Sequence, residues 1–319
     1  MGKTFGSNAV DLEQRANADP SEDRLGWIGA GRMGAALVER LLDGGRELSL
    51  FNRTSSKAEP LRAAGATLVD SAAEVADRDI VFTIVTGDEA LKAVTLGPDG
   101  LLSRDAAPAV IVDSSTVSTA VSEEVRHEAD ERGTMLLAAP VSGNPDAIRA
   151  GNLAVVASGP EAAMSRAEPH LDLFGSSVTY VGEGDAARFV KICHNLILLT
   201  LTASIGEVLV LAERAGISRA DFLAFLNSSV LGSTFTGYKT RAFSELDFSP
   251  TATTELLAKD ADLGLDAARA LSVELPLIEA VRELLAATVT AGFGESDFAA
   301  MIEVQAQASG VTLAGRDRP

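Results

Sequence analysis

The pattern of the chain changes near residue 184, and this change constrains the fold more than any other feature. Between Leu25 and about Val181, short runs rich in β-forming residues alternate with amphipathic helical stretches. We expect strands at Leu25–Gly29, Leu48–Asn52, Ile80–Val85, Val110–Asp113, Met135–Ala138 and Leu153–Ser158. Such alternation predicts an α/β domain built on a doubly wound parallel sheet with right-handed crossovers.

After Gly184 the strand-like runs end and long helical periodicity takes over. We expect helices over residues 186–215, 218–228, 253–272 and 277–291, so the second domain should be all helix. Ser218 followed by Asp221 resembles a capping box, and Gly216 ends the helix before it. A chain of 319 residues also exceeds what one core usually serves. We therefore predict an α/β domain over residues 24–183 and a helical domain over 184–319, joined by one long interdomain helix.

The composition narrows the class of partner and the cellular location. A formal net charge of -18 repels nucleic acid and anionic membrane surfaces. One cysteine, Cys193, and three scattered histidines argue against both a disulfide framework and a metal site. Residues 1–23 are polar and acidic, which predicts a loose tail and not a signal peptide. The apolar stretch 196–212 is interrupted by polar residues, so we expect a buried core helix and no membrane span. The single cysteine fits a reducing compartment, so we expect a cytoplasmic protein.

A glycine-rich turn follows the first expected strand and opens the next helix. Its sequence is Gly29-Ala30-Gly31-Arg32-Met33-Gly34. In this context the first glycine permits a tight turn, the second lets a pyrophosphate approach the backbone, and the third lets helix pack on strand. The amides at the start of the helix then face the phosphates. The sequence predicts a Rossmann-type dinucleotide site that includes Gly29, Gly31, Arg32, Met33 and Gly34.

The residues after the second expected strand indicate which dinucleotide binds. NAD enzymes usually place a carboxylate there for the ribose 2′-hydroxyl, but this segment reads Asn52-Arg53-Thr54-Ser55-Ser56-Lys57 and has no acid. A guanidinium, hydroxyls and a lysine can surround a 2′-phosphate. We therefore expect NADP(H) over NAD(H), held by Asn52, Arg53, Thr54 and Lys57. A polar loop with solvated charges is the alternative interpretation.

A second polar cluster, Asp113-Ser114-Ser115-Thr116, ends another expected strand at the edge where open α/β sheets bind ligands. Ser115 and Thr116 are candidates for contact with the nicotinamide half of the cofactor. The same hydroxyls could instead cap the helix expected from Ser118 to Arg132. The sequence leaves both interpretations open.

Four segments, taken in order, resemble the β-hydroxyacid dehydrogenase family. This family includes 3-hydroxyisobutyrate dehydrogenase, glyoxylate/succinic semialdehyde reductase and, more distantly, 6-phosphogluconate dehydrogenase. The segments are the glycine-rich turn, Ala139-Pro140-Val141-Ser142-Gly143, Gly182 through Lys191 to Asn195, and Lys259-Asp260. The resemblance spans about Leu25 to Ala308. It implies hydride transfer between a nicotinamide and a small carboxylated alcohol or aldehyde, and a homodimer or tetramer. The stretch 189–212 is apolar on nearly every face, which indicates that subunits pack through the helical domain.

Lys191 and Asn195 are the candidate catalytic residues. They are four positions apart, so on a regular helix they share one face. Hydride transfer from an alcohol requires the hydroxyl proton to leave, and a desolvated lysine suits that exchange. We expect Lys191 to act as the general acid/base. Asn195 cannot titrate, but its amide can hold the substrate oxygen or carboxylate.

Further substrate contacts come from the turn and from the helical domain. Ser142 and Gly143 lie in a turn whose exposed amides, together with the Ser142 hydroxyl, can bind a carboxylate. The resemblance implies the same role. Asn144 departs from the second glycine common in the family and narrows the pocket or adds a donor. The resemblance assigns Lys259 to the cofactor and substrate, and it places Phe235 and Tyr238 in a variable stretch that lines the pocket. Ordinary helix surface or core packing is the alternative interpretation for these three residues.

Related chemistries on the same scaffold give the alternatives. 6-Phosphogluconate dehydrogenases carry an acid three residues beyond the asparagine, where this chain has Leu198, so oxidative decarboxylation is not expected. Imine reductases generally have a different residue in place of Lys191. A noncatalytic cofactor-binding module is the third interpretation, and the presence of Lys191, Asn195 and Ser142 together argues against it.

Overall fold

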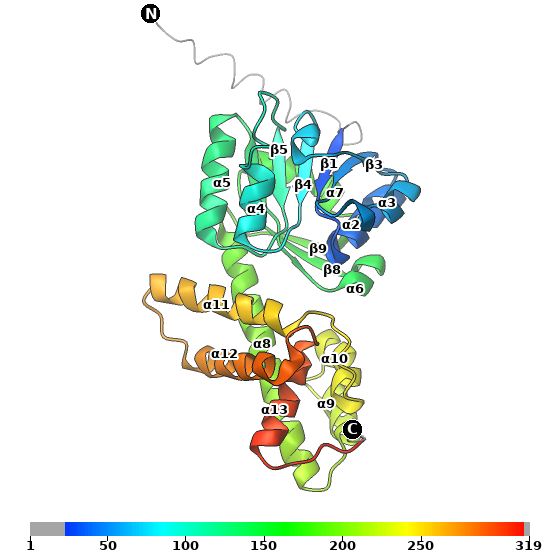
Figure 1. Ribbon diagram of the computed structural model, residues 1–319, viewed down its shortest axis with the longest axis vertical. Coiled ribbons are helices and arrows are strands. Elements are labelled where there is room, and N and C mark those ends of the chain that lie inside the picture. Colours follow the sequence, from blue (N-terminus) through cyan, green and yellow to red (C-terminus); the bar gives the residue numbers. More distant parts are fainter. Residues whose placement is uncertain (1–22, 316–319) are drawn as a thin grey trace, which may run out of the picture. The chain divides into compact units, whose positions relative to one another are not determined.

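A computed structural model describes residues 23–315 of the chain, and Figure 1 shows its elements. These residues divide into two compact units, the first ending at Lys191 and the second beginning at Ile192. The division falls inside one helix, α8 (Ala186–Arg214), as the expected joining helix predicts. The tail predicted for residues 1–23 lies outside the described residues, apart from Asp23.

The first unit is built on a six-stranded parallel sheet (Figure 1). Its strands are β1 (Leu25–Ile28), β2 (Leu48–Phe51), β3 (Thr67–Leu68), β4 (Ile80–Thr83), β5 (Val110–Asp113) and β6 (Met135–Ala138). They lie in the order β3-β2-β1-β4-β5-β6, so successive strands are added on one side of β1 up to β3 and on its other side from β4 onward. In such a doubly wound sheet, ligands bind outside the carboxyl ends of the strands on either side of that switch point.

Two apolar clusters cover the two faces of this sheet because neighbouring strand residues point to opposite sides. Trp27 and Phe82 pack on one face with α2 (Arg32–Asp43) and α7 (Glu161–Leu171). Ile28 and Val81 pack on the other face with α4 (Asp88–Thr95) and α5 (Thr119–Glu131). The strands are short and almost fully apolar, as expected for a parallel sheet buried on both sides.

Shorter elements complete the connections of this unit. They are the helix α3 (Glu59–Ala63), the helical turns at Ser55–Lys57 and Ala72–Val75, and the two-residue strand β3 at the edge of the sheet. The predicted doubly wound α/β fold is therefore confirmed, and five of the expected strands begin and end within two residues of the observed ones.

The sixth expected strand, Leu153–Ser158, belongs to a different sheet. It forms β8 (Leu153–Ala157), the central strand of a three-stranded sheet with β7 (Val141–Ser142) and β9 (Gly175–Tyr180). β7 runs antiparallel to β8, whereas β9 runs parallel to it. The expectation that this strand extends the parallel sheet is therefore wrong. An apolar run such as Leu153–Ala157 does not show which sheet it joins, because pairing partners depend on the turns between the strands.

The second unit is helical throughout its described part. After the last turns of α8 come α9 (Arg219–Ser228), α10 (Thr234–Ser244), α11 (Thr254–Ala270), α12 (Pro276–Thr288) and α13 (Met301–Ala308), with helical turns at Val289–Phe293 and Phe298–Ala300. Ser218 caps α9 by accepting a hydrogen bond from the Asp221 amide, as expected, and Thr253 caps α11. The sequence pattern did not predict α10 or α13.

The middle of α8 is apolar on most of its surface. By length and composition alone this helix could span a membrane, but core helices of soluble proteins meet the same two criteria. Within its most apolar window, 56% is buried inside the protein. The exposed part includes Ile197, Leu201, Val208 and Leu211, which we call the α8 stripe. Ile197 and Leu211 are each 70% exposed. These positions repeat at intervals of three, four or seven residues, so they lie along one side of the helix.

Candidate cofactor and substrate site

The glycine-rich turn at the end of β1 has the geometry that a bound pyrophosphate requires. Gly29 has φ +105°, and a Cβ there would overlap the Ile84 carbonyl oxygen. A Cβ on Gly34 would overlap the Gly29 carbonyl oxygen, so helix α2 can pack on the turn only with glycine at this position. In contrast, a Cβ on Gly31 would meet no atom within 4 Å. The glycines at both ends serve the fold, and the middle one leaves an open space in front of the helix N-terminus, which fits a dinucleotide phosphate.

Asn52 supports this turn from the end of the neighbouring strand. Its Oδ1 accepts a hydrogen bond of 2.8 Å from the Ala30 amide, and its Nδ2 donates one of 2.7 Å to the Thr54 carbonyl. The side chain expected to bind the cofactor therefore joins the glycine-rich turn to the loop that follows β2. Its position is fixed by these two bonds, and its contact with a cofactor stays a prediction.

The loop after β2 offers charged and hydroxyl groups to solvent beside the turn. Arg53, Thr54 and Lys57 are all exposed, and the loop carries no carboxylate between residues 52 and 57. Arg32 is exposed at the start of α2, while Met33 is half-buried and packs against the apolar core. This arrangement suits an anionic group next to the ribose, because opposite charges are available and no acid opposes it.

The Ser115 hydroxyl is committed to the protein itself. Ser115 is 1% exposed; its Oγ donates to Asp113 Oδ1 at 2.7 Å and accepts from the Val85 amide at 2.9 Å. Little of this side chain is exposed, and contact of Ser115 with the nicotinamide stays a prediction. Ser118, and not Ser115 or Thr116, caps α5 by accepting from the Val121 amide. Thr116 is half-buried and bridges to Thr86 at the same edge of the sheet.

The predicted carboxylate-binding turn lies at the end of the antiparallel strand β7. Ser142 is the last residue of that strand and is half-buried, and Gly143 follows with φ +147°, a conformation that favours glycine. Asn144 caps the short helix α6 (Pro145–Arg149), since its Oδ1 accepts from the Ala147 amide at 2.9 Å. The departure from the family's glycine at residue 144 thus has a local explanation in helix capping.

Lys191 lies near the start of α8 and is half-buried. One turn before it, Arg188 is almost completely buried and forms an ion pair with Asp113, with 2.8 Å between Nη2 and Oδ2. Arg188 and Asp113 were not among the residues that the sequence analysis singled out. The signals that could have found them are an arginine on the same face as Lys191 and an aspartate at the carboxyl end of a central strand.

In the second unit, Asn195 is fixed by a buried carboxylate. Its Nδ2 donates a hydrogen bond of 2.8 Å to Asp260 Oδ2, and Lys259 Nζ lies 3.3 Å from Asp260 Oδ1. The Asn195 Oδ1 lies 3.1 Å from Nδ1 of His194. Asn195 and Asp260 are both buried, so this hydrogen bond is shielded from water and fixes the orientation of the Asn195 amide. The structure thus joins two predicted residues, Asn195 and Lys259, through Asp260.

The two aromatic candidates share α10. The rings of Phe235 and Tyr238 contact each other edge to face, with 5.2 Å between their centroids. Burial, and then the negative charge of Asp297, raise the pKa of the Tyr238 hydroxyl. This hydroxyl therefore stays protonated at neutral pH and can donate a hydrogen bond, but it is a poor source of a transferable proton.

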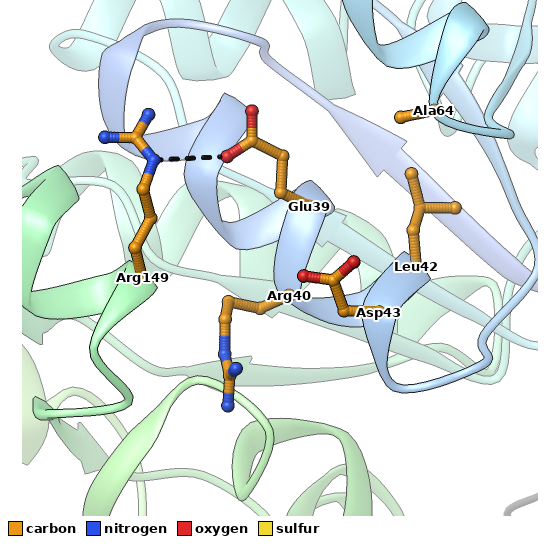
Figure 2. Close-up of a pocket in the computed structure, with 6 residues that line it drawn as sticks. All are labelled: Glu39, Arg40, Leu42, Asp43, Ala64 and Arg149. Carbon is orange, nitrogen blue, oxygen red and sulfur yellow. Dashed lines mark hydrogen bonds and ion pairs between the residues drawn. The ribbon is translucent and has the colours of Figure 1, made fainter.

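A surface hollow of about 470 Å³ lies elsewhere in the first unit (Figure 2). It is lined by residues of α2, α6 and the end of α3: Glu39, Arg40, Leu42, Asp43, Ala64 and Arg149. Arg149 and Glu39 form an ion pair of 3.4 Å at its edge, drawn as a dashed line in Figure 2. None of the predicted site residues lines this hollow. Residues 23–315 contain no group of three or more Asp, Glu, His or Cys side chains that could hold a metal ion.

Comparisons with protein-family models cover both units. Residues 24–182 match the NAD binding domain of 6-phosphogluconate dehydrogenase. Residues 184–305 match the NAD-binding domain of NADP-dependent 3-hydroxyisobutyrate dehydrogenase. The two matches together extend over the sheet, the glycine-rich turn, Lys191, Asn195 and Lys259.

Individual proteins resemble the chain over nearly their whole lengths. An uncharacterized oxidoreductase of Bacillus subtilis (strain 168) is 33% identical over 88% of this chain and 99% of its own. The 2-(hydroxymethyl)glutarate dehydrogenase of Eubacterium barkeri is 31% identical over 92% of this chain and 98% of its own. The crystal structure of a 3-hydroxyisobutyrate dehydrogenase from Salmonella typhimurium superposes with a TM-score of 0.81 at 27% identity, covering 89% of this chain and all of that one.

These matches agree with the site geometry and with the motifs in the sequence. The first unit has a glycine-rich turn at the carboxyl edge of a Rossmann sheet, and the helical second unit matches the 3-hydroxyisobutyrate dehydrogenase model. The similarity therefore extends through both units. The chain therefore belongs to the β-hydroxyacid dehydrogenase family, and it is an oxidoreductase that uses a pyridine nucleotide to act on hydroxyl-bearing substrates.

Proposed function

We propose that the protein transfers a hydride between NADP(H) and a small carboxylated alcohol or aldehyde, with Lys191 as general acid/base. The observation that most supports this is the pairing of Lys191 and Asn195 one turn apart on α8, with the Asn195 amide held by the buried Asp260 carboxylate. A lysine one helical turn from a fixed amide suits proton exchange with a substrate oxygen. The names of two relatives, 2-(hydroxymethyl)glutarate dehydrogenase and 3-hydroxyisobutyrate dehydrogenase, point the same way.

The bound nicotinamide supplies or accepts the hydride in this reaction. During reduction, the Lys191 ammonium donates a proton to the substrate oxygen as the carbonyl carbon becomes tetrahedral, and during oxidation the neutral amine takes that proton back. Asn195 positions the substrate oxygen or carboxylate beside the lysine. We propose that Ser142, the Gly143 amide and Lys259 bind the substrate carboxylate, since each offers a hydrogen-bond donor.

The preference for NADP(H) is part of the proposal. It rests on Arg53, Thr54 and Lys57, which are exposed after β2 in a loop without an acid. Replacing Arg53 with aspartate should weaken NADP binding by about tenfold or more and leave NAD binding unchanged or tighter, because the new carboxylate repels the 2′-phosphate. Titration of cofactor fluorescence with both nucleotides measures this. Unchanged NADP affinity in Arg53→Asp would mean that another group recognises the 2′-phosphate.

We also propose that the protein is a cytoplasmic homo-oligomer assembled through its helical unit. The α8 stripe supports this assignment, because large apolar side chains that are 70% exposed on a 29-residue helix gain from burial against another copy. A regular seam of this kind can pack against the same seam of a second chain. A net charge of -18 disfavours nucleic acid and anionic membranes as alternative partners.

One substrate panel tests the central proposal. NADPH consumption is followed with glyoxylate, succinic semialdehyde, related carboxylated aldehydes and cyclic imines, in the parent, Lys191→Ala and Lys92→Ala. Lys92 is a matched control because it is a surface lysine of the first unit, paired with Glu124. Turnover of a carboxylated aldehyde that is lost only in Lys191→Ala supports the proposal. Imine turnover that survives in Lys191→Ala indicates an imine reductase, and cofactor binding without any turnover indicates a noncatalytic module.

A further inference from the structure

The first turn of α8 is attached to the carboxyl edge of the sheet through Arg188. This side chain is 2% exposed and belongs to the same compact unit as the glycine-rich turn and Lys191. Its Nη2 donates to Asp113 Oδ2 at 2.8 Å, its Nη1 donates to the Ser115 carbonyl at 3.1 Å, and its Nε donates to Ser122 Oγ at 2.6 Å. A guanidinium satisfied on all three nitrogens has one orientation, because its planar fork fits few sets of acceptors.

The acceptors of Arg188 are themselves held in place. Asp113 Oδ1 accepts from the Thr83 hydroxyl at 2.5 Å and from the Ser115 hydroxyl at 2.7 Å. Thr83 and Asp113 are the last residues of the neighbouring strands β4 and β5. On the helix side, Asp185 accepts from Ser122 and from Arg126 of α5 at 2.5 and 2.8 Å. The network therefore connects two strand ends, α5 and the start of α8.

The same network reaches the cofactor turn. The Ser115 hydroxyl accepts from the Val85 amide, directly beyond the end of β4. Ile84 and Val85 are also the residues that lie against Gly29, the first glycine of the turn. Arg188 is thus connected through Ser115 and Val85 to the backbone that shapes the dinucleotide site.

Lys191 follows Arg188 by three residues on one regular helix. The two Cα atoms therefore lie on the same face and about 4.5 Å apart along the helix axis. An arginine that fixes the helix at residue 188 also fixes where residue 191 begins its side chain. A shift of about 1 Å in a catalytic group is enough to cost roughly a hundredfold in rate.

We infer that Arg188, with Asp113 as its partner, is the positioning residue for Lys191: it registers the catalytic helix against the carboxyl edge of the sheet where the nicotinamide half of the cofactor binds. The inference rests on the proposed function of Lys191. It requires no contact of Arg188 with substrate or cofactor, since the side chain is buried within the first unit.

The test compares two buried arginines of the same unit. Arg188→Lys and Asp113→Asn change the network conservatively. Arg166→Lys is the matched control, because Arg166 is 5% exposed and pairs with Asp23 at 2.6 Å, before the first residue of β1 and so at the opposite edge of the sheet. For each variant we measure kcat and KM with the best aldehyde of the panel, the pH profile of kcat, the dissociation constant of NADPH, and the thermal midpoint.

Arg188→Lys and Asp113→Asn should each lower kcat by about tenfold or more, with KM and the NADPH dissociation constant changed by less than about threefold. The limb of the pH profile that disappears in Lys191→Ala should move in both variants, because the environment of the amine changes. Arg166→Lys should lower the thermal midpoint about as much as Arg188→Lys does, but it should change neither kcat nor that limb of the pH profile. A purely structural role does not produce this difference.

Two results overturn the inference, and they are distinguishable from failure of the proposed function. If Arg188→Lys resembles Arg166→Lys, with a lowered midpoint, an unmoved pH limb and kcat near the parent value, then Arg188 only stabilises the fold. If Asp113→Asn retains the parent kcat while Arg188→Lys loses it, the ion pair is not the positioning element. If Lys191→Ala keeps full activity, the proposed function itself is wrong, whatever the arginine variants do.

Discussion

Individual side chains in this protein often serve a neighbour before they serve a ligand. Asn52, Ser115 and Asn144 all carry polar groups at positions where a ligand contact is expected, yet each uses a side-chain oxygen to accept from a backbone amide. The sequence correctly indicates where such residues stand, at strand ends and turns. It cannot indicate the partners of Asn52 and Ser115, because those amides lie far away in the sequence and become neighbours only in the folded chain.

Asp260 offers the clearest prediction at this scale. Asp260→Ala removes the acceptor that orients the Asn195 amide and the partner of Lys259. We expect kcat/KM to fall by about tenfold or more, and the free energy of unfolding to fall by about 1–3 kcal/mol, because a buried donor loses its acceptor. Steady-state kinetics and urea unfolding measure both. Asp266→Ala, an exposed aspartate of the same helix, is the control, and equal losses in the two variants would contradict the orienting role.

The glycines of the turn give a second residue-scale prediction. Gly31→Ala should fold normally and weaken NADPH binding by about tenfold, because the new methyl group meets no protein atom but occupies the space of the pyrophosphate. Gly34→Ala should instead lower the thermal midpoint, because its Cβ overlaps the Gly29 carbonyl. Thermal unfolding and cofactor titration separate the two. Parent-like affinity in Gly31→Ala would mean that the phosphates do not approach residue 31.

At the scale of elements, long-range ion pairs join segments that are distant in sequence. Lys239 of α10 is buried, with Nζ 2.5 Å from Asp297 Oδ1 and 2.8 Å from Thr251 Oγ1, and it lies 3.9 Å from the centre of the Phe298 ring. Asp297 in turn caps the helical turn Phe298–Ala300. This one pair therefore holds α10, the loop before α11 and the segment before α13 together. Burial lowers the pKa of Lys239, while the charge and hydrogen bond of Asp297 oppose that shift.

Breaking this pair from one side should be costly. Lys239→Met leaves the Asp297 carboxylate buried without its countercharge, and we expect the free energy of unfolding to fall by about 3–5 kcal/mol. Urea unfolding at neutral pH measures the loss. Lys92→Met, which removes a lysine from an ion pair on the protein surface, should change stability little. A small effect of Lys239→Met would show that water reaches the carboxylate.

A second buried ion pair predicts how stability depends on acidity. Burial alone would raise the pKa of Asp23, but hydrogen bonds from His170 and Arg166 and their charges together lower it below 3.8. A carboxylate whose pKa is lower in the folded state stabilises the protein at pH values above the unfolded pKa, and this contribution is lost as the pH falls through the folded pKa. Asp23 should therefore stabilise the fold at neutral pH and not in strong acid.

Asp23→Asn tests this directly. The variant should unfold at lower urea concentration than the parent at neutral pH, and the gap between the two should shrink as the pH is lowered past 3.8. Urea titrations across the acidic range measure the gap. A gap that stays constant with pH would show that Asp23 contributes through packing and not through its charge.

The extent to which elements can be predicted follows from their chemistry. The central strands of the large sheet are short, almost wholly apolar runs, and this pattern predicts buried parallel strands. β7 has only two residues and β9 is polar and largely exposed, so neither carries a strong signal. α10 follows a segment rich in serine, glycine and threonine, which reads as loop, although Ser233 in fact caps the helix. Tertiary packing decides such weak elements.

For the molecule as a whole, the sequence predicts the order of the units, the family and a homodimer or tetramer formed through the helical domain, but not which residues form the interface. The change from alternating to purely helical periodicity after Gly184 indicates two units, and four motifs in order indicate the family. The substrate is set by side chains from several segments, whose mutual distances no linear pattern contains. The α8 stripe is visible only once the buried sides of the helix are known.

Assembly gives the prediction at this largest scale. If the proposed oligomer forms through the α8 stripe, Ile197→Glu and Leu211→Glu should convert it to monomers, since a charge at an apolar interface is costly to bury. Light scattering coupled to size-exclusion chromatography measures the mass. Phe225→Glu, at an equally exposed apolar residue of α9, is the control. A monomeric parent would disprove assembly through the stripe.

The two hydrogen bonds of Asn52 carry a consequence for redesigning this enzyme. A loop exchange intended to convert its coenzyme choice would naturally replace residues 52–57 as a block with those of an NAD-using relative. Such a graft would also remove the amide that braces Ala30, and with it the shape of the turn that any nicotinamide dinucleotide needs. Successful swaps should therefore begin at residue 53, and libraries that vary residue 52 should lose affinity for both coenzymes alike.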